Sequence, residues 1–180
     1  MLQMTAEVRS PKVMRGTVVF TDIVGFTEYT ALRGDEGAME LLSTQDRLVR
    51  EALPEGARIV KELGDGLLLW FPDACEALST TLRLQERFEA VSSELTVPLW
   101  VRVGIHSGRQ TLRGDDLIGH DVNVASRVVD FAGPSEVLLS HATLAQIDDK
   151  LPDVSFEELG PVVMKGIPQP VQLYRAQRAA

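Results

Sequence analysis

The segment from residue 58 to residue 71 constrains the fold most, because it predicts a β-hairpin. The rest of the chain alternates between strand and helix patterns. Two strand-like runs, Arg58–Leu63 and Leu67–Phe71, are separated by Gly64-Asp65-Gly66, a tripeptide typical of a tight turn. A hairpin joins antiparallel neighbours, whereas parallel neighbours need a crossover connection, usually a helix. We therefore expect a mixed sheet with its helices on one face, and not a doubly wound parallel sheet.

The rest of the chain alternates between patterns typical of strands and patterns typical of helices. A β-branched run, Val18–Ile23, predicts a buried strand, and the helical region after it is broken near Gly34, with Asp35 as a candidate N-cap for a helix over Ala38–Ala52. The other expected elements are a helix capped by Asp73 and ending near Val91, a strand opened by Pro98, a helix over Gly119–Ala132, a strand over Glu136–Leu139, a short helix over Ala142–Ile147, and two strands near Val163 and Leu173. This order predicts an α+β fold, an α/β sandwich with a ferredoxin-like βαββαβ core, a mixed and mainly antiparallel sheet, and C-terminal αβ additions.

The length of 180 residues allows one well-buried core, and no segment marks a second domain of independent size. We expect residues 16–180 to form that domain and residues 1–15 to be a flexible terminus or the stub of a linker. The longest apolar runs, such as Leu67–Phe71, are too short to cross a bilayer, and the N-terminus lacks a hydrophobic signal core. We therefore expect a soluble protein. The single cysteine, Cys75, suits a cytoplasmic location.

The charge balance argues against a nucleic acid partner. The chain has 18 Lys and Arg residues against 26 Asp and Glu residues, a formal charge of −8, and no basic tract interleaved with aromatic residues. A small anionic ligand stays compatible with this charge if the basic residues gather at one place and a metal ion helps to neutralise the ligand.

Two aspartates are candidate metal ligands. Asp22 stands where the apolar run of the first strand approaches Gly25, and Asp65 lies in the turn of the predicted hairpin. Carboxylates at such positions are suited to hold a hard cation. The alternative for Asp22 is a turn or a helix cap, and both interpretations stay open on this segment alone.

The chain contains neither a GxxxxGK[ST] loop nor a GxGxxG fingerprint. If a nucleotide binds, its phosphates need a different cradle. The residues Gly25, Phe26 and Thr27 lead from a strand into a helix, so their backbone N–H groups are candidates for holding phosphate oxygens.

The predicted helix around residues 121–132 carries a narrow polar strip between two apolar stripes. Asn123 and Arg127 are four residues apart and share one face of this helix. Such a strip suits a helix that lines a cleft or an interface. The alternative is that Arg127 pairs with Asp130 on a solvated edge.

Two lysines have open interpretations. Lys61 is predicted to point to the same side of its strand as Leu63, where it needs a partner, unless it is an ordinary lysine of an edge strand. Lys165 precedes Gly166 at the expected tip of the C-terminal strand pair, where a lysine is often only solvated. His106, His120 and His141 show no ligand spacing, so we assign them no chemistry.

Taken together and in this order, these segments resemble the catalytic domain of class III nucleotidyl cyclases, the adenylyl and guanylyl cyclase family. The resemblance extends from about Gly16 to Arg175 and rests on five motifs: FTDIVGFT, KELGDG, VRVGIHSG, DLIGHDVNVASR and VMKG. The short stretch between Gly108 and Asp116 is similar to the compact bacterial branch, which lacks the longer dimerisation arm of the mammalian-type enzymes.

The resemblance implies that Asp22 and Asp65 bind two divalent cations, Mg²⁺ or Mn²⁺, with the Ile23 carbonyl as a further ligand. It also implies that Lys61 and Asp116 read the base. A lysine donates to adenine N1 and an aspartate accepts from the N6 amine, whereas guanine presents the opposite pattern, so this pair favours ATP. Guanylyl cyclases typically carry glutamate and a small residue such as cysteine at these positions.

The remaining implied roles concern the ribose and the phosphates. By the resemblance, Asn123 orients the ribose and Arg127 stabilises charge on the α-phosphate in the transition state. Arg102 contacts the phosphates, and Lys165 holds the β- and γ-phosphates. The implied reaction is in-line attack of the ribose 3′-hydroxyl on the α-phosphorus, which gives 3′,5′-cyclic AMP and pyrophosphate.

In this family the metal aspartates come from one subunit, and the base-reading and transition-state residues come from the other. All of them are present in this chain, so the resemblance implies a head-to-tail homodimer with two shared sites. The alternatives are a guanylyl or relaxed-specificity cyclase, and a non-catalytic nucleotide-binding or dimerisation module of the same fold.

Overall fold

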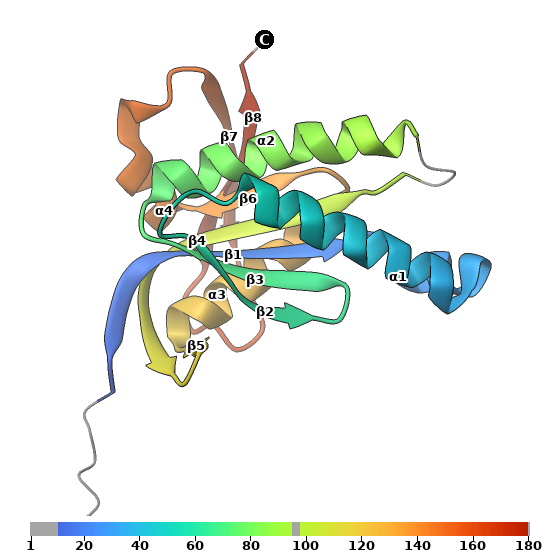
Figure 1. Ribbon diagram of the computed structural model, residues 1–180. Coiled ribbons are helices and arrows are strands. Elements are labelled where there is room, and N and C mark those ends of the chain that lie inside the picture. Colours follow the sequence, from blue (N-terminus) through green and yellow to red (C-terminus); the bar gives the residue numbers. More distant parts are fainter. Residues whose placement is uncertain (1–10, 95–97, 180) are drawn as a thin grey trace, which may run out of the picture.

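The computed structural model describes residues 11–94 and 98–179, so residues 1–10 of the predicted N-terminal segment lie outside the described residues. The described strands form one sheet in the order β2-β3-β1-β4-β6-β8-β7, with β5 paired to β4 (Figure 1). Strands β4 and β6 run parallel, and the other paired strands run antiparallel. The strands are β1 Val13–Ile23, β2 Arg58–Leu63, β3 Gly66–Phe71, β4 Val101–Arg113, β5 Asp116–Ile118, β6 Val137–Ser140, β7 Val154–Val162 and β8 Val171–Arg178.

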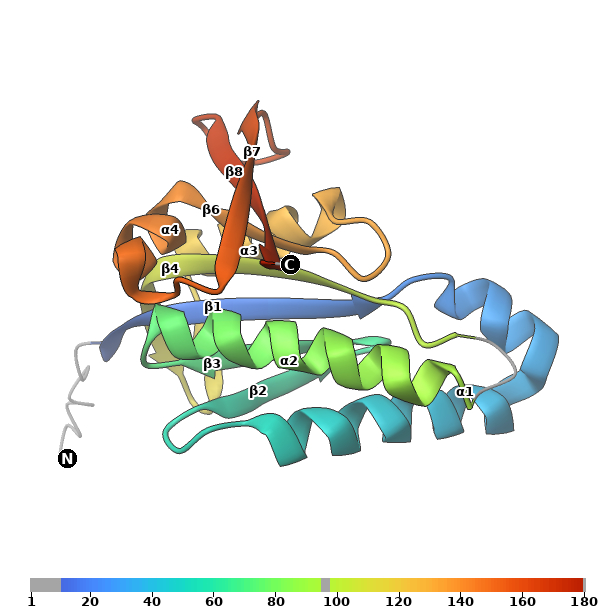
Figure 2. The ribbon, with the colours of Figure 1, turned by 90° about the horizontal axis from the view of Figure 1, so that it is seen from above.

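The predicted ferredoxin-like core is confirmed by the order β1-α1-β2-β3-α2-β4. Figure 2 shows α1 and α2 running along the same face of the sheet, while β7 and β8 project beyond β6 at its far side. The helices are α1 Phe26–Ala52, α2 Ala74–Ser92, α3 His120–Val128 and α4 His141–Ile147, with 3₁₀ turns over Val129–Phe131 and Asp148–Lys150. The N-cap predicted for α2 is confirmed, because Asp73 accepts a hydrogen bond from the backbone N–H of Glu76 at 2.9 Å.

The expectation that all helices lie on one face is wrong. Helices α1, α2 and α4 pack on one face of the sheet, where Val19, Leu69 and Ile105 belong to the main core cluster. Helix α3 covers the other face and packs against Val18 and its neighbours (Figure 1). Val18 and Val19 are both fully buried, because layers on both sides cover β1. A strand covered on both faces loses the alternation of polar and apolar residues that marks a solvated face.

Other differences concern element boundaries. Strand β1 begins at Val13 and not at Val18 as predicted, because residues 13–17 also pair with β4. Strand β5 was not expected, and its three residues pair with Thr111–Arg113. The helix break expected near Gly34 is confirmed as a kink within α1, where Gly34 has φ 72° and ψ −177°. In the described ranges, none of the helices has both the length and the apolar character that crossing a bilayer requires.

Candidate active site

Asp22 lies near the end of β1, which lies between β3 and β4 in the sheet. In the sheet register it pairs with Gly66 of β3 on one side and with Arg102 of β4 on the other. The Arg102 guanidinium donates to Asp22 Oδ2 through Nε at 2.7 Å and through Nη2 at 2.6 Å. About a quarter of each side chain is exposed, 26% for Asp22 and 28% for Arg102. The pair therefore lies at the edge of solvent, where an incoming anion or cation has access to it.

Asp65 reaches the same end of the sheet because the β2–β3 turn is tight. Gly64 adopts φ 69°, and a Cβ on Gly66 would lie only 2.3 Å from the Thr21 carbonyl oxygen, so the backbone of the turn approaches β1 closely. Burial raises the pKa of Asp65, and the nearby charge of Asp22 raises it further. A divalent cation bound by both carboxylates would offset the charge that Asp22 places beside Asp65.

The site offers two carboxylate side chains that could bind a metal ion, those of Asp22 and Asp65. Within residues 11–94 and 98–179, no group of three or more His, Cys, Asp or Glu side chains is arranged to hold a metal ion. Ile23 is buried, with 3% exposure, next to Asp22. Further oxygen ligands must therefore come from backbone carbonyls, water or a bound anion, as is usual for Mg²⁺.

Gln45 is a part of this site that sequence reasoning missed. It lies on α1 and is buried to 1% exposure. Its Nε2 donates to the Asp65 carbonyl at 3.3 Å, and its Oε1 accepts from the Thr21 hydroxyl at 3.4 Å. Thr21 also accepts from the Leu67 N–H at 3.1 Å. One buried amide thus connects α1 to both segments that carry the aspartates. The only signal in the sequence was a glutamine among the apolar positions of an amphipathic helix.

The predicted phosphate cradle lies at the start of α1. Gly25 is the N-cap residue and has the left-handed values φ 74° and ψ 22°. The preceding loop is held by a hydrogen bond of 2.8 Å from the Val24 N–H to the Trp100 carbonyl. The first turn of α1, which contains Phe26 and Thr27, directs its backbone N–H groups away from the helix body at the end of β1.

Lys61 forms an ion pair with Asp116, so the partner expected for this lysine is present. Its Nζ lies 2.7 Å from Asp116 Oδ2, and both side chains are 38% exposed. The hydrogen bond from Lys61 lowers the pKa of Asp116. The two residues are 55 positions apart in the chain and come from β2 and β5, so the structure brings together the two predicted base-reading residues.

Lys61 and Asn123 line one cavity of about 340 Å³ between β2, β5 and α3. The residues around it are mainly apolar, with a few polar side chains, which is the usual composition of a pocket for a planar heterocycle. Its lining consists of Phe20, Lys61, Leu63, Leu68, Leu117, Ile118, Gly119, Val122, Asn123 and Ser126.

Helix α3 presents its polar strip outward. Val124 and Val128 are buried, whereas Asn123 and Arg127 are exposed. Arg127 Nη1 lies 3.6 Å from Asp130 Oδ2, and the two side chains are 44% and 51% exposed. This is the solvated pair foreseen as the alternative, and its exposure leaves the guanidinium accessible to a ligand.

Lys165 is exposed in the β7–β8 loop. The loop is anchored next to α3, because Met164 and Ile167 pack in one cluster with Val124 and Val128. Lys165 and the α3 strip therefore belong to neighbouring parts of the surface.

The predicted site residues thus fall into two groups. Asp22, Asp65 and Arg102 gather at the ends of β1, β3 and β4, and the other group surrounds α3. Among the hydrogen bonds and ion pairs of the described residues, none joins Asp22 or Asp65 to Asn123, Arg127 or Lys165. The predicted site residues thus form two separate groups in one chain, which we call the two half-sites.

Known proteins resemble this chain over most of its length. A family model described as the adenylate and guanylate cyclase catalytic domain matches residues 8–177. The chain is 32% identical over 172 residues to the pH-sensitive adenylate cyclase of Mycobacterium tuberculosis. The aligned region covers 94% of the chain and 42% of that protein. It is 38% identical over 129 residues to the adenylate cyclase of Streptomyces griseus, covering 71% and 31%. The adenylyl cyclase CyaB from P. aeruginosa superposes with a TM-score of 0.84 at 28% identity, over 95% and 97% of the two chains. The chain spans less than half the length of both curated relatives.

Proposed function

Because the chain belongs to the family of adenylate and guanylate cyclase catalytic domains, we propose that it is an adenylate cyclase that converts ATP to 3′,5′-cyclic AMP and pyrophosphate. The observation that carries the choice of ATP is the Lys61–Asp116 pair beside the cavity that Asn123 also lines. We also expect the protein to act in the cytoplasm, where ATP is available.

The pair matches adenine in hydrogen-bond polarity. An ammonium group only donates and a carboxylate only accepts, so Lys61 suits the acceptor N1 and Asp116 suits the N6 amine. Guanine presents an acceptor at O6 and a donor at N1, which reverses both positions. The apolar side chains Leu68, Leu117 and Val122 supply the faces against which the base packs.

Two divalent cations, Mg²⁺ or Mn²⁺, fit the Asp22–Asp65 end of the sheet, because both side chains offer oxygen ligands, and burial and then the nearby charge of Asp22 raise the pKa of Asp65. Asp22, Asp65 and the Ile23 carbonyl are the groups that would hold them. When bound, such cations lower the pKa of the ribose 3′-hydroxyl and neutralise the triphosphate.

The other residues orient the substrate and stabilise charge. Asn123 positions the ribose so that its 3′-oxygen is in line with the α-phosphorus. Arg127 stabilises the charge that develops on the α-phosphate, a role for which arginine side chains are worth roughly 10³-fold or more in rate. Lys165, Arg102 and the N–H groups of Gly25, Phe26 and Thr27 hold the remaining phosphate oxygens.

We propose that the complete site forms between two copies of the chain arranged head to tail. Between the residues that the structure describes, no hydrogen bond or ion pair joins the two half-sites within one chain, and both half-sites are present in it. Large apolar side chains stay exposed beside the α3 half: Leu63 at 40%, Ile118 at 40% and Phe131 at 47%. Exposed apolar residues that flank polar functional groups are typical of an interface. A homodimer would then contain two equivalent sites.

The direct test is to identify the product. Purified chain is incubated with ATP or with GTP, in the presence of Mg²⁺ or Mn²⁺, and the products are identified by mass. We expect cyclic AMP and pyrophosphate from ATP and little cyclic GMP from GTP. Cyclic GMP as the main product would overturn the substrate assignment, and nucleotide binding without any cyclic product would favour the non-catalytic module.

The choice of base is tested by Lys61→Glu combined with Asp116→Gly. We expect kcat/KM for ATP to fall by about 100-fold, because two hydrogen bonds to charged groups are lost or reversed. The control is Arg178→Glu with Glu86→Ala, which changes an exposed ion pair between β8 and α2 that belongs to neither half-site. An unchanged preference for ATP in the Lys61 and Asp116 variant would show that other residues read the base.

A further inference from the structure

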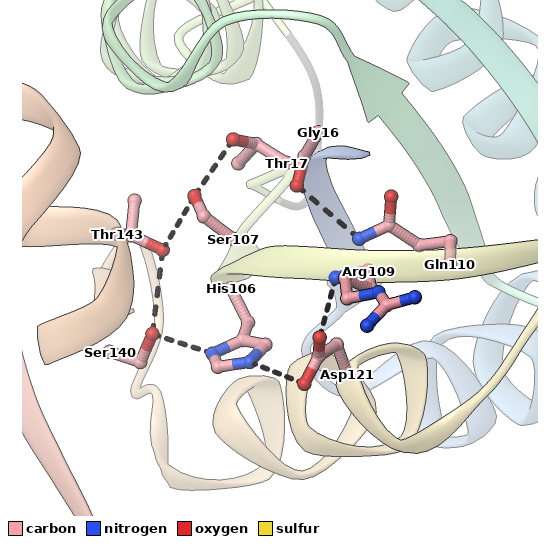
Figure 3. Close-up of polar contacts among 9 residues, drawn as sticks. All are labelled: Gly16, Thr17, His106, Ser107, Arg109, Gln110, Asp121, Ser140 and Thr143. Atoms are coloured by element: carbon pink, nitrogen blue, oxygen red, sulfur yellow. Dashed lines mark hydrogen bonds and ion pairs between the residues drawn. The ribbon is translucent and has the colours of Figure 1, made fainter. Parts of the chain in front are cut away.

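Buried hydroxyl groups form a hydrogen-bonded chain between β1, β4, α4 and β6 (Figure 3). Thr17 Oγ1 lies 2.8 Å from Ser107 Oγ, and Ser107 Oγ donates to Thr143 Oγ1 at 3.1 Å. Thr143 Oγ1 lies 3.4 Å from Ser140 Oγ. All four side chains are at most 3% exposed. Because an unpaired buried hydroxyl is costly, each of them depends on its neighbours in the chain.

The hydrogen-bonded series of side chains continues through His106 to the first turn of α3. Ser140 Oγ lies 2.6 Å from His106 Nδ1, and His106 Nε2 lies 3.3 Å from Asp121 Oδ1. The other oxygen of Asp121 accepts a hydrogen bond from the Arg109 N–H of β4 at 2.5 Å. A Cβ on Gly108 would lie 2.0 Å from Asp121 Oδ2, so only glycine leaves room for this carboxylate. Asp121 is therefore fixed to β4 from two directions.

The carboxylate determines the direction of every hydrogen bond in the chain. An ionised Asp121 only accepts, so His106 Nε2 carries a proton and donates to it. Burial lowers the pKa of His106, against the opposing charge of Asp121 and in the same direction as the nearby His120. In the neutral ring, Nδ1 accepts from Ser140, which accepts from Thr143 in turn. Ser107, Thr143 and Ser140 then each donate once and accept once, Thr17 donates to Ser107 at the far end, and the hydrogen bonds end on Asp121.

Helix α3 turns by about 100° per residue, which places Asp121 and the polar strip on opposite sides. Asn123 follows Asp121 by two residues, and Arg127 follows it by six. When Asp121 faces β4, both of these side chains face outward, as their exposure requires. The contact between Asp121 and β4 thus fixes the rotation of α3 about its axis.

We propose that His106 and Asp121 are positioning residues for the cyclase reaction, which hold the first turn of α3 against β4 so that Asn123 and Arg127 meet the nucleotide in the productive orientation. This inference rests on the proposed function. Neither residue touches substrate. Their contribution is geometric, and a misplacement of about 1 Å in a catalytic group lowers turnover by about 100-fold.

The test compares Asp121→Ala with Asp73→Ala. Asp73 is the matched control, because it also accepts a backbone N–H at the start of a helix but belongs to α2, outside both half-sites. We expect Asp121→Ala to lower kcat by tenfold or more while KM for ATP changes less than about twofold, since Lys61 and Asp116 lie on other elements. Asp121→Asn keeps the shape and one acceptor but turns the other acceptor into an NH₂ donor, which would face either the Arg109 N–H or the His106 Nε2 proton. We therefore expect a partial loss of kcat that is smaller than the loss in Asp121→Ala.

Coupling between the two residues provides a second measurement. If His106 acts through Asp121, the double variant His106→Ala with Asp121→Ala loses no more turnover than Asp121→Ala alone. Losses that multiply would overturn the proposal. It would also be overturned by wild-type kcat in Asp121→Ala or by an equal loss of kcat in Asp73→Ala.

Amide hydrogen exchange separates this proposal from the proposed function. It is measured on the same proteins without nucleotide, so it does not depend on cyclase activity. Faster exchange in α3 of Asp121→Ala, with α3 unchanged in Asp73→Ala, supports the anchoring of α3 even if the wild-type chain makes no cyclic nucleotide. Unchanged exchange in α3 contradicts it.

Discussion

Replacing Asp22 by alanine is expected to lower cyclase turnover by about 1000-fold or more, because the site would lose a metal ligand and with it the charge stabilisation of the triphosphate. The fold should survive. Asp22 lies near the end of β1 with 26% exposure, and its side chain contacts Arg102 at the solvent edge and not the main core. Asp22→Asn keeps the shape but removes the charge, so it should be impaired almost as severely.

Two further measurements distinguish loss of metal binding from loss of structure. Binding of Mn²⁺ alone, followed by electron paramagnetic resonance, should weaken in both Asp22 variants, while thermal unfolding stays close to that of the wild type. The matched control is Asp46→Ala, which also removes an aspartate paired with arginine, at 33% exposure and on the surface of α1. Retained activity in Asp22→Ala would overturn the metal assignment, and an equal loss in Asp46→Ala would indicate a general structural effect.

The local part of the fold could be predicted from the sequence. The β2–β3 hairpin follows from the glycines around Asp65, and the start of α2 follows from the cap at Asp73, because both depend on a few neighbouring residues. The second layer could not be predicted in the same way. Val18 and Val19 are both buried, and a strand with two buried faces carries no alternation that would tell which helix covers which face.

The candidate site shows the same limit at the level of side chains. The need of Lys61 for a partner was visible in its strand, but its contact with Asp116 joins residues 55 positions apart. Gln45 gave only the signal of a glutamine among apolar helix positions and His106 gave none, because their roles arise only where α1 and α3 meet the sheet. Buried polar residues of this kind obtain their partners from tertiary structure, so their function is not encoded in local spacing.

The second large effect is expected when two inactive variants are mixed. Asp65→Ala should remove the metal half-site and Arg127→Ala the transition-state half-site, so each homodimer should be reduced at least about 100-fold. A heterodimer of the two variants would contain one site with both defects and one site with neither. With free exchange of subunits, half of the dimers are mixed, so recovery should approach about a quarter of wild-type activity per chain.

The expected recovery of a quarter of the activity follows from the separation of the half-sites in each chain. Asp65 lies in the β2–β3 turn and Arg127 lies on α3, and no contact among the described residues joins their groups. The matched control is a mixture of Asp65→Ala with Asp22→Ala. Both changes damage the same half-site, so every site in every dimer keeps one defect and no recovery is expected. Native mass spectrometry would verify that mixed dimers form in both mixtures. Only a shared site makes recovery depend on which half-sites are damaged. Equal recovery in the two mixtures would therefore contradict a site shared between subunits. So would the absence of recovery in the mixture of Asp65→Ala with Arg127→Ala when its mixed dimers are present.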